Sequence, residues 1–71
     1  MMGISKFAVR LRELRNERGL SCMKLAEGIG VSDTSVIRWE NGQADIKGEY
    51  LILVAKFFNV TTDYLLGVKD F

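Results

Sequence analysis

The fold is decided by residues 25–42, which read LAEGIGVSDTSVIRWENG. The apolar positions in this stretch recur at helical spacing on both sides of a short break, which predicts two short helices joined by a tight turn. Ala26 stands where these helices cross, and its small side chain does not hold them apart. Gly30 stands in the turn, where a positive φ angle would strain any residue with a Cβ atom. The stretch therefore predicts a helix, a tight turn and a second helix.

The same approach predicts five helices in the whole chain. Phe7, Leu11 and Leu14 share one helical face, so residues 6–18 predict an amphipathic helix that Gly19 ends. A serine or threonine suits the start of three further helices. The second helix is expected to start at Ser21 and to end at Gly28 and Gly30. The third is expected over 33–41 after Ser32, the fourth over about 48–58, and the fifth from Thr61 to Gly67. The fold class is therefore all-α and compact.

Composition limits the possible functions. With 71 residues, of which 48% are hydrophobic, we expect one domain over 1–71, with a core at 6–67 and a tail at 68–71. One cysteine and no histidine exclude a disulfide within the chain and leave a zinc site without enough ligands. Residues 1–6 lack the apolar core of a signal peptide, and the apolar run at 50–54 is too short to span a bilayer. A cytoplasmic protein is expected.

Net charge gives little guidance, because ten Lys and Arg residues are balanced by nine Asp and Glu residues. A protein that binds nucleic acid mainly through phosphates usually has a strongly basic face. Any such face must come from the distribution of charge along the chain. The N-terminal part of the chain does contain a cluster of basic residues, but an ordinary solvated helix surface with ion pairs accounts for most of them equally well. The cluster consists of Lys6, Arg10, Arg12, Arg15, Arg18 and Lys24.

With these residues placed, the chain resembles the lambda-repressor-like helix-turn-helix family, also called Cro-like or XRE-type regulators. The resemblance covers about residues 6–67, and its motifs occur in order at the family's spacing. They are Gly19-Leu20-Ser21, Leu25-Ala26, Gly30-Val31-Ser32, Arg38-Trp39-Glu40-Asn41-Gly42, Phe58-Asn59-Val60-Thr61 and Asp63-Tyr64-Leu65-Leu66-Gly67. The resemblance implies a five-helix DNA-binding domain with a central helix-turn-helix. It also implies a sequence-specific transcriptional regulator of bacterial or phage type, associated with the nucleoid, with repression as the expected direction.

The resemblance makes residues 33–41 the recognition helix, which enters the major groove of double-stranded DNA. Its outward face would carry Asp33, Thr34, Ile37 and Arg38. Arg38 is the first choice for a base contact, because a guanidinium donates two hydrogen bonds to O6 and N7 of guanine. Thr34 and Ile37 suit a thymine methyl group, and the Asp33 carboxylate suits cytosine N4. An ordinary exposed helix face is the alternative, and it applies most to Asp33.

The resemblance also implies phosphate contacts at the starts of the second and third helices and after the third. The residues concerned are Cys22, Lys24, Ser32, Ser35 and Asn41, with Lys47 as the one basic residue of the following loop. An ion pair between Arg15 and Glu40 is implied as well, holding the first helix against the third. Cys22 stands where the family often has glutamine, and the loop lacks the family's usual basic residues and proline. We therefore expect DNA binding with a shallow salt dependence.

The predicted helix at 48–58 carries more apolar surface than one core stripe needs. Tyr50, Leu53 and Phe57 lie on a face rotated away from its core residues. We expect Leu53 and Phe57 to form part of a two-fold interface, so that two recognition helices read the halves of a palindromic operator. In the alternative, Tyr50 and Phe57 fold over the edge of the core within one chain. Assembly of the homodimer only on DNA stays open.

A protein-interaction module of the same fold is the competing function. It would use the apolar face of residues 48–58, and the near-neutral charge, Asp33 and the non-basic loop favour it. An enzyme is not expected, because the chain has no histidine, no nucleophile beside a base and no phosphate-binding glycine loop. No cofactor, metal, small-molecule ligand or membrane partner is expected. Oxidation sensing by Cys22, at a predicted helix start, is a minor alternative to a half-buried structural role.

Overall fold

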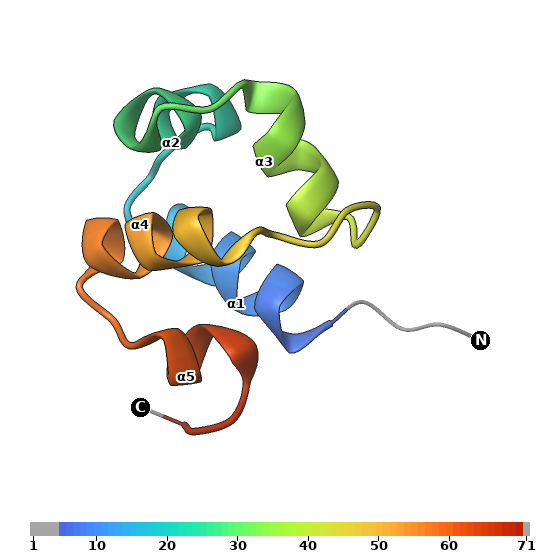
Figure 1. Cartoon of the computed structure of the whole chain (residues 1–71). Coiled ribbons are helices and arrows are strands. Elements are labelled where there is room, and N and C mark those ends of the chain that lie inside the picture. The colour runs from blue at the N-terminus through green and yellow to red at the C-terminus, as the bar shows by residue number, and fades with distance from the viewer. Residues whose placement is uncertain (1–4, 71) are drawn as a thin grey trace.

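The computed structural model describes residues 5–70, which form five α-helices and no strand. The helices are α1 (Lys6–Glu17), α2 (Cys22–Ile29), α3 (Asp33–Glu40), α4 (Gly48–Phe58) and α5 (Thr62–Leu66). Figure 1 shows α2 and α3 at one end of the molecule, α5 at the other end, and α1 and α4 between them. The predicted all-α class is confirmed. The first and third helices each end one residue earlier than expected, because Arg18 and Asn41 are their caps.

Local side-chain chemistry sets most helix boundaries. Four helices start at a hydroxyl that accepts a hydrogen bond of 3.0–3.3 Å from a backbone N–H three residues further on. These caps are Ser5, Ser21, Ser32 and Thr61. Gly30, with φ +81°, ends α2 in the left-handed region that favours glycine. Gly28 was also expected to end α2, but it lies inside the helix and only Gly30 ends it.

Each helix contributes one side chain that is completely removed from solvent. These side chains are Leu11, Leu25, Val36, Val54 and Leu65, in the order of the helices. Burying one such side chain contributes about 1.5–3 kcal/mol, so every helix is tied to the same core. None of the described helices has the length and apolar character that crossing a membrane requires.

The packing of α4 uses aromatic residues that were expected at its surface. A Cβ atom added to Gly28 would lie 2.5 Å from Cε1 of Phe57, so the ring occupies the space left by the glycine. Tyr50 is half-buried, and its ring centroid lies 6.2 Å from that of Trp39. The structure therefore shows the alternative in which Tyr50 and Phe57 fold over the edge of the core. Leu53 stays 42% exposed.

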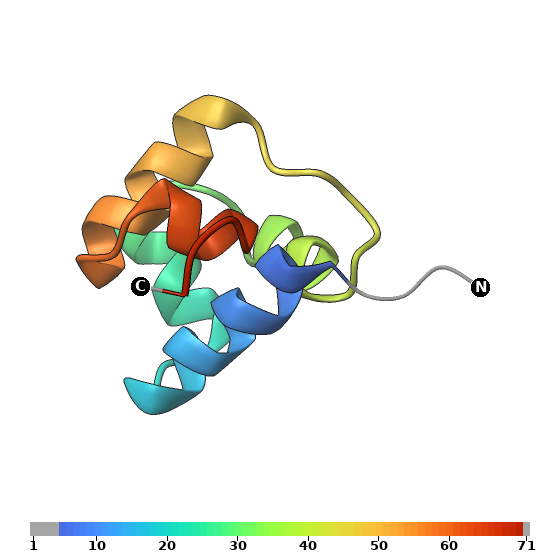
Figure 2. The same ribbon diagram turned by 90° about the horizontal axis from the view of Figure 1, so that it is seen from below.

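Arg10 ties the segment after α5 to α1. Its guanidinium lies 4.3 Å from the centroid of the Tyr64 ring and donates hydrogen bonds to the carbonyl oxygens of Tyr64 and Lys69. Figure 2 shows α5 and the segment that follows it beside α1. Arg18 likewise donates a 3.1 Å hydrogen bond to the carbonyl oxygen of Phe58. Two members of the basic cluster therefore hold the fold together through backbone carbonyls.

Candidate nucleic-acid interface

The turn between α2 and α3 places the two helices against each other. Ala26 is 2% exposed, and its carbonyl oxygen accepts hydrogen bonds from the N–H groups of Gly30 at 2.8 Å and Val31 at 3.0 Å. These two bonds pair a carbonyl group in the last turn of α2 and turn the chain, and Ser32 then caps α3. The sequence thus builds a helix, a tight turn and a second helix from one alanine, one glycine and one capping serine.

The third helix presents two different faces. Val36, Trp39 and Glu40 are buried against the rest of the domain. Thr34 and Arg38 are exposed on the other side. Ile37 is exposed too, at 42% of its surface, whereas Asp33 in the first turn is half-buried and so less accessible. Three of the four residues expected to touch bases therefore lie on a free surface, and Asp33 is the least accessible of them.

The residues expected to contact phosphates have varied surroundings. Lys24 and Asn41 are exposed, Cys22 and Ser35 are half-buried, and the Ser32 hydroxyl lies 3.1 Å from that of Ser35. The ammonium group of Lys24 lies 3.7 Å from the Glu27 carboxylate, and both side chains are more than 60% exposed, so this pair contributes little to stability. Lys47 is separated from α3 by the loop and stands at the start of α4.

The expected pair of Arg15 and Glu40 is present. Nε and one terminal nitrogen of Arg15 donate hydrogen bonds of 2.6 and 2.9 Å to the two carboxylate oxygens of Glu40. The hydrogen bond to Glu40 raises the pKa of Arg15 above its usual value. A third bond, of 2.8 Å, reaches the carbonyl oxygen of Leu20. Since Glu40 is only 3% exposed, this pair joins α1 to the end of α3 inside the domain.

Arg12 is the residue that the sequence reasoning missed. Its Nε lies 3.3 Å from the Glu40 carboxylate, and a terminal nitrogen donates a 3.1 Å hydrogen bond to the side-chain oxygen of Asn41. Arg12 precedes Arg15 by three residues, which places both on one side of α1. Given the expected pair of Arg15 and Glu40, this spacing indicates that Arg12 also faces the end of α3.

The surroundings of Cys22 argue against oxidation sensing. Burial raises the pKa of its thiol above the ordinary value, and the Glu40 carboxylate raises it further. Arg15 and Arg12 lower this pKa, but the effects that raise it prevail. A raised pKa disfavours the reactive thiolate, and Cys22 is half-buried, so the structure favours the structural role over the minor alternative of oxidation sensing.

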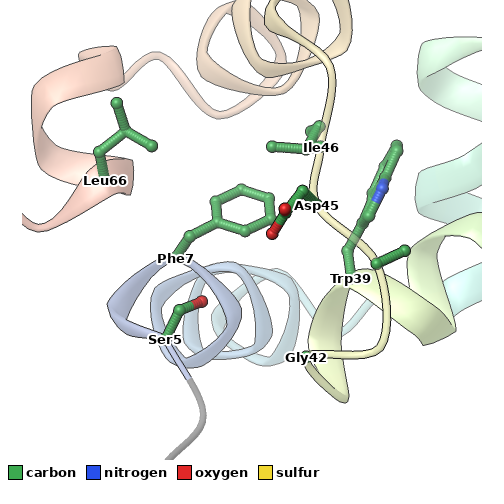
Figure 3. A pocket seen from close by; sticks show the side chains of 8 residues that line it. Ser5, Phe7, Trp39, Gly42, Asp45, Ile46 and Leu66 are labelled. Atoms are coloured by element: carbon green, nitrogen blue, oxygen red, sulfur yellow. The ribbon is translucent and has the colours of Figure 1, made fainter.

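A hollow of about 420 Å³ opens between the start of α1, the end of α5 and the loop after α3. Figure 3 shows the Phe7 ring lying between Leu66 and the loop residues Asp45 and Ile46. Asp45 is the one ionisable group among the eight lining residues, so the hollow lacks a pair of groups for acid and base catalysis. The described residues also contain no group of three or more His, Cys, Asp or Glu side chains suited to a metal ion.

Known proteins with similar sequences are described as helix-turn-helix proteins, in agreement with this geometry. Residues 11–65 match a family model described as helix-turn-helix. The chain is 39% identical over 65 residues to the HTH-type transcriptional activator BcrR of Enterococcus faecalis, covering 92% of this chain and 32% of BcrR. It is 37% identical over 64 residues to the cryptic phage CTXphi transcriptional repressor RstR of Vibrio cholerae, covering 90% of this chain and 58% of RstR. The chain thus spans about a third to somewhat more than half of these relatives.

Solved structures show the same arrangement of helices. The P22 c2 repressor protein, in a crystal structure with a synthetic operator, superimposes with a TM-score of 0.84 at 27% sequence identity. The match covers 89% of this chain and 96% of the repressor chain. The five-helix architecture with a central helix-turn-helix is therefore confirmed.

Proposed function

The chain belongs to the helix-turn-helix family, and from this premise we propose that it is a transcriptional regulator that binds double-stranded DNA through α3. The observation that carries the proposal is the two-sided character of this helix. Val36 and Trp39 fix it to the domain, while Thr34, Ile37 and Arg38 stand free on its outer side. An α-helix held in this way fits the width of the major groove, where base edges are accessible.

The free side chains of α3 match the chemistry of base edges. The exposed guanidinium of Arg38 is free to donate two hydrogen bonds to O6 and N7 of one guanine. Thr34 and Ile37 supply methyl groups for contact with thymine, and a 42% exposed isoleucine loses apolar surface to water when it makes that contact. Asp33 accepts from cytosine N4, but its half-buried position makes it the weakest of the four. Together these residues specify the sequence.

Phosphate contacts orient the protein on the duplex without reading sequence. Lys24 and Asn41 are exposed for this role, and the capped starts of α2 and α3 add backbone N–H groups. The further proposed contacts are Cys22, Ser32, Ser35 and Lys47. With so few cations near α3, binding releases about three to five counterions per protomer.

We further propose that two copies bind a palindromic operator and repress transcription by occupying the promoter. Leu53 is 42% exposed and its neighbour Ile52 is 50% exposed, so α4 retains apolar surface for a two-fold contact. Phe57 is half-buried with its ring against Gly28, so it is the weaker of the two proposed interface residues. Changing Leu53 to glutamate should abolish cooperative binding to two half-sites and leave single half-site binding intact. Unchanged cooperativity would rule out this interface.

A protein-interaction module is the second candidate, and the exposed pair Ile52 and Leu53 together with a net charge of +1 favours it. The two functions separate in one titration of a fluorescently labelled pool of random-sequence duplexes. A DNA-binding regulator binds the pool at low salt, and its affinity falls as about three to five counterions are released. Absence of binding at the lowest salt concentration would reject the regulator and leave the interaction module.

A further inference from the structure

Arg12 is a surplus charge in the cluster that joins α1 to α3. The cluster contains two guanidinium groups and one buried carboxylate, that of Glu40. Arg15 already covers both carboxylate oxygens with short hydrogen bonds and is largely buried with them, its side chain being 16% exposed. Arg12 makes a longer contact of 3.3 Å and keeps 46% of its side chain exposed. The cluster therefore carries one net positive charge, and that charge faces solvent.

The surplus charge lies at the end of α3. A terminal nitrogen of Arg12 lies 3.4 Å from the carbonyl oxygen of Glu40 and 3.1 Å from the side-chain oxygen of Asn41, the residue that caps the helix. The C-terminal end of a helix carries a partial negative charge, which repels a phosphate unless a cation offsets it. Arg12 supplies that cation at the end of α3.

Arg12 also sets the orientation of Asn41. Because the side-chain oxygen of Asn41 accepts from Arg12, the amide nitrogen points to the other side of the group and stays available as a donor. Among the described residues, this nitrogen has no hydrogen-bond partner, and Asn41 is exposed. One exposed guanidinium and one oriented amide thus present donors side by side.

We propose that Arg12 and Asn41 form a phosphate clamp, in which both donate to one phosphate group of the operator backbone at the end of α3. This proposal rests on the proposed DNA binding and adds Arg12 to the interface. Arg12 acts twice in the clamp, as a direct charged donor and as the residue that positions the Asn41 amide.

Salt-dependent binding to a duplex of random sequence tests the clamp, because a phosphate contact does not depend on base sequence. Arg12→Ala should lower the affinity about tenfold and reduce the slope of log K against log salt by about 0.9. Arg12→Lys keeps the charge but lacks the planar fork, so it should keep the slope and still lose affinity. Lys56→Ala, which removes one exposed charge from the last turn of α4, is the matched control and should leave both quantities unchanged.

A double-mutant cycle tests the positioning role. Asn41→Ala should weaken binding in the wild-type background and have a much smaller effect when Arg12 is already alanine. Thermal melting should show Arg12→Ala folded, because Arg15 still pairs with Glu40. Wild-type affinity and slope in Arg12→Ala would overturn the clamp while leaving the proposed function standing. Fully additive losses would overturn the positioning role, and a wild-type protein that binds no duplex would overturn both the function and the clamp.

Discussion

Replacing Arg15 with methionine removes one half of a buried ion pair and should destabilise the fold strongly. Glu40 is 3% exposed, and Arg15 contributes the two shortest hydrogen bonds to its carboxylate, at 2.6 and 2.9 Å. Removing one partner of a buried pair costs about 3–5 kcal/mol, because the remaining charge stays buried without compensation. Arg12 still contacts the carboxylate at 3.3 Å, so we expect a loss at the lower end of this range, about 3 kcal/mol.

This loss is large for a domain of 71 residues. The free energy of unfolding of such a domain is about 4–11 kcal/mol, and a loss of about 3 kcal/mol lowers the melting temperature by about 12–24 °C. Trp39, the only tryptophan in the chain, is 6% exposed and therefore changes its fluorescence on unfolding. Urea titration followed at this residue measures the free energy of unfolding of each variant.

The double variant Arg15→Met with Glu40→Met separates the loss of a partner from the value of the pair. Apolar residues of similar volume often replace a buried ion pair at no net cost. The double variant should therefore be more stable than Arg15→Met alone by about 2 kcal/mol. A single variant that unfolds at the wild-type urea concentration would refute the reasoning, and so would a double variant less stable than the single one.

Two other predictions concern packing and thiol reactivity. Gly28→Ala should cost about 1–3 kcal/mol by pressing on the Phe57 ring, whereas Gly48→Ala, with nothing within 4 Å of the new Cβ, should be close to neutral in thermal melting. Equal melting temperatures would show that Phe57 moves aside freely. Cys22 should react with iodoacetamide more slowly at neutral pH than a cysteine in the urea-unfolded chain, because burial raises its thiol pKa. Because the thiol pKa is higher in the folded chain than in the unfolded chain, its contribution to the free energy of unfolding is complete at neutral pH. This contribution is lost as the pH rises through the folded-state pKa. Equal alkylation rates in the folded and unfolded chains would contradict this assignment.

The fold was largely predictable from the sequence because its signals are local. Ser21, Ser32 and Thr61 cap helices by bonding to residues only three positions away, and Gly30 adopts its positive φ angle within the turn itself. Periodicity also separated the buried Val36 from the free Arg38 on α3. Such features depend on a few neighbouring residues, and one sequence contains them in full.

The remaining features depend on contacts between distant parts of the chain. Arg10 reaches carbonyl groups more than 50 residues away, and nothing near it in the sequence distinguishes it from a solvated arginine. Phe57 packs inside the chain because a glycine of α2 faces it, which periodicity within α4 does not reveal. The spacing of Arg12 from Arg15 indicates its side of α1, but its hydrogen bond to Asn41 depends on how α1 and α3 pack together. Which bases the predicted contacts of α3 would read likewise depends on the DNA and not on the chain alone.

The central claim is that the outer face of α3 reads DNA sequence, and selection of binding sites from a random duplex library at low salt tests it most directly. The wild-type protein is compared with Arg38→Ala, with Lys56→Ala as the control for loss of one charge. The account predicts a palindromic motif that Arg38→Ala relaxes at one base pair in each half-site, by about 1–3 kcal/mol, and that Lys56→Ala leaves unchanged. No enriched motif, or the same motif with Arg38→Ala, would contradict the account.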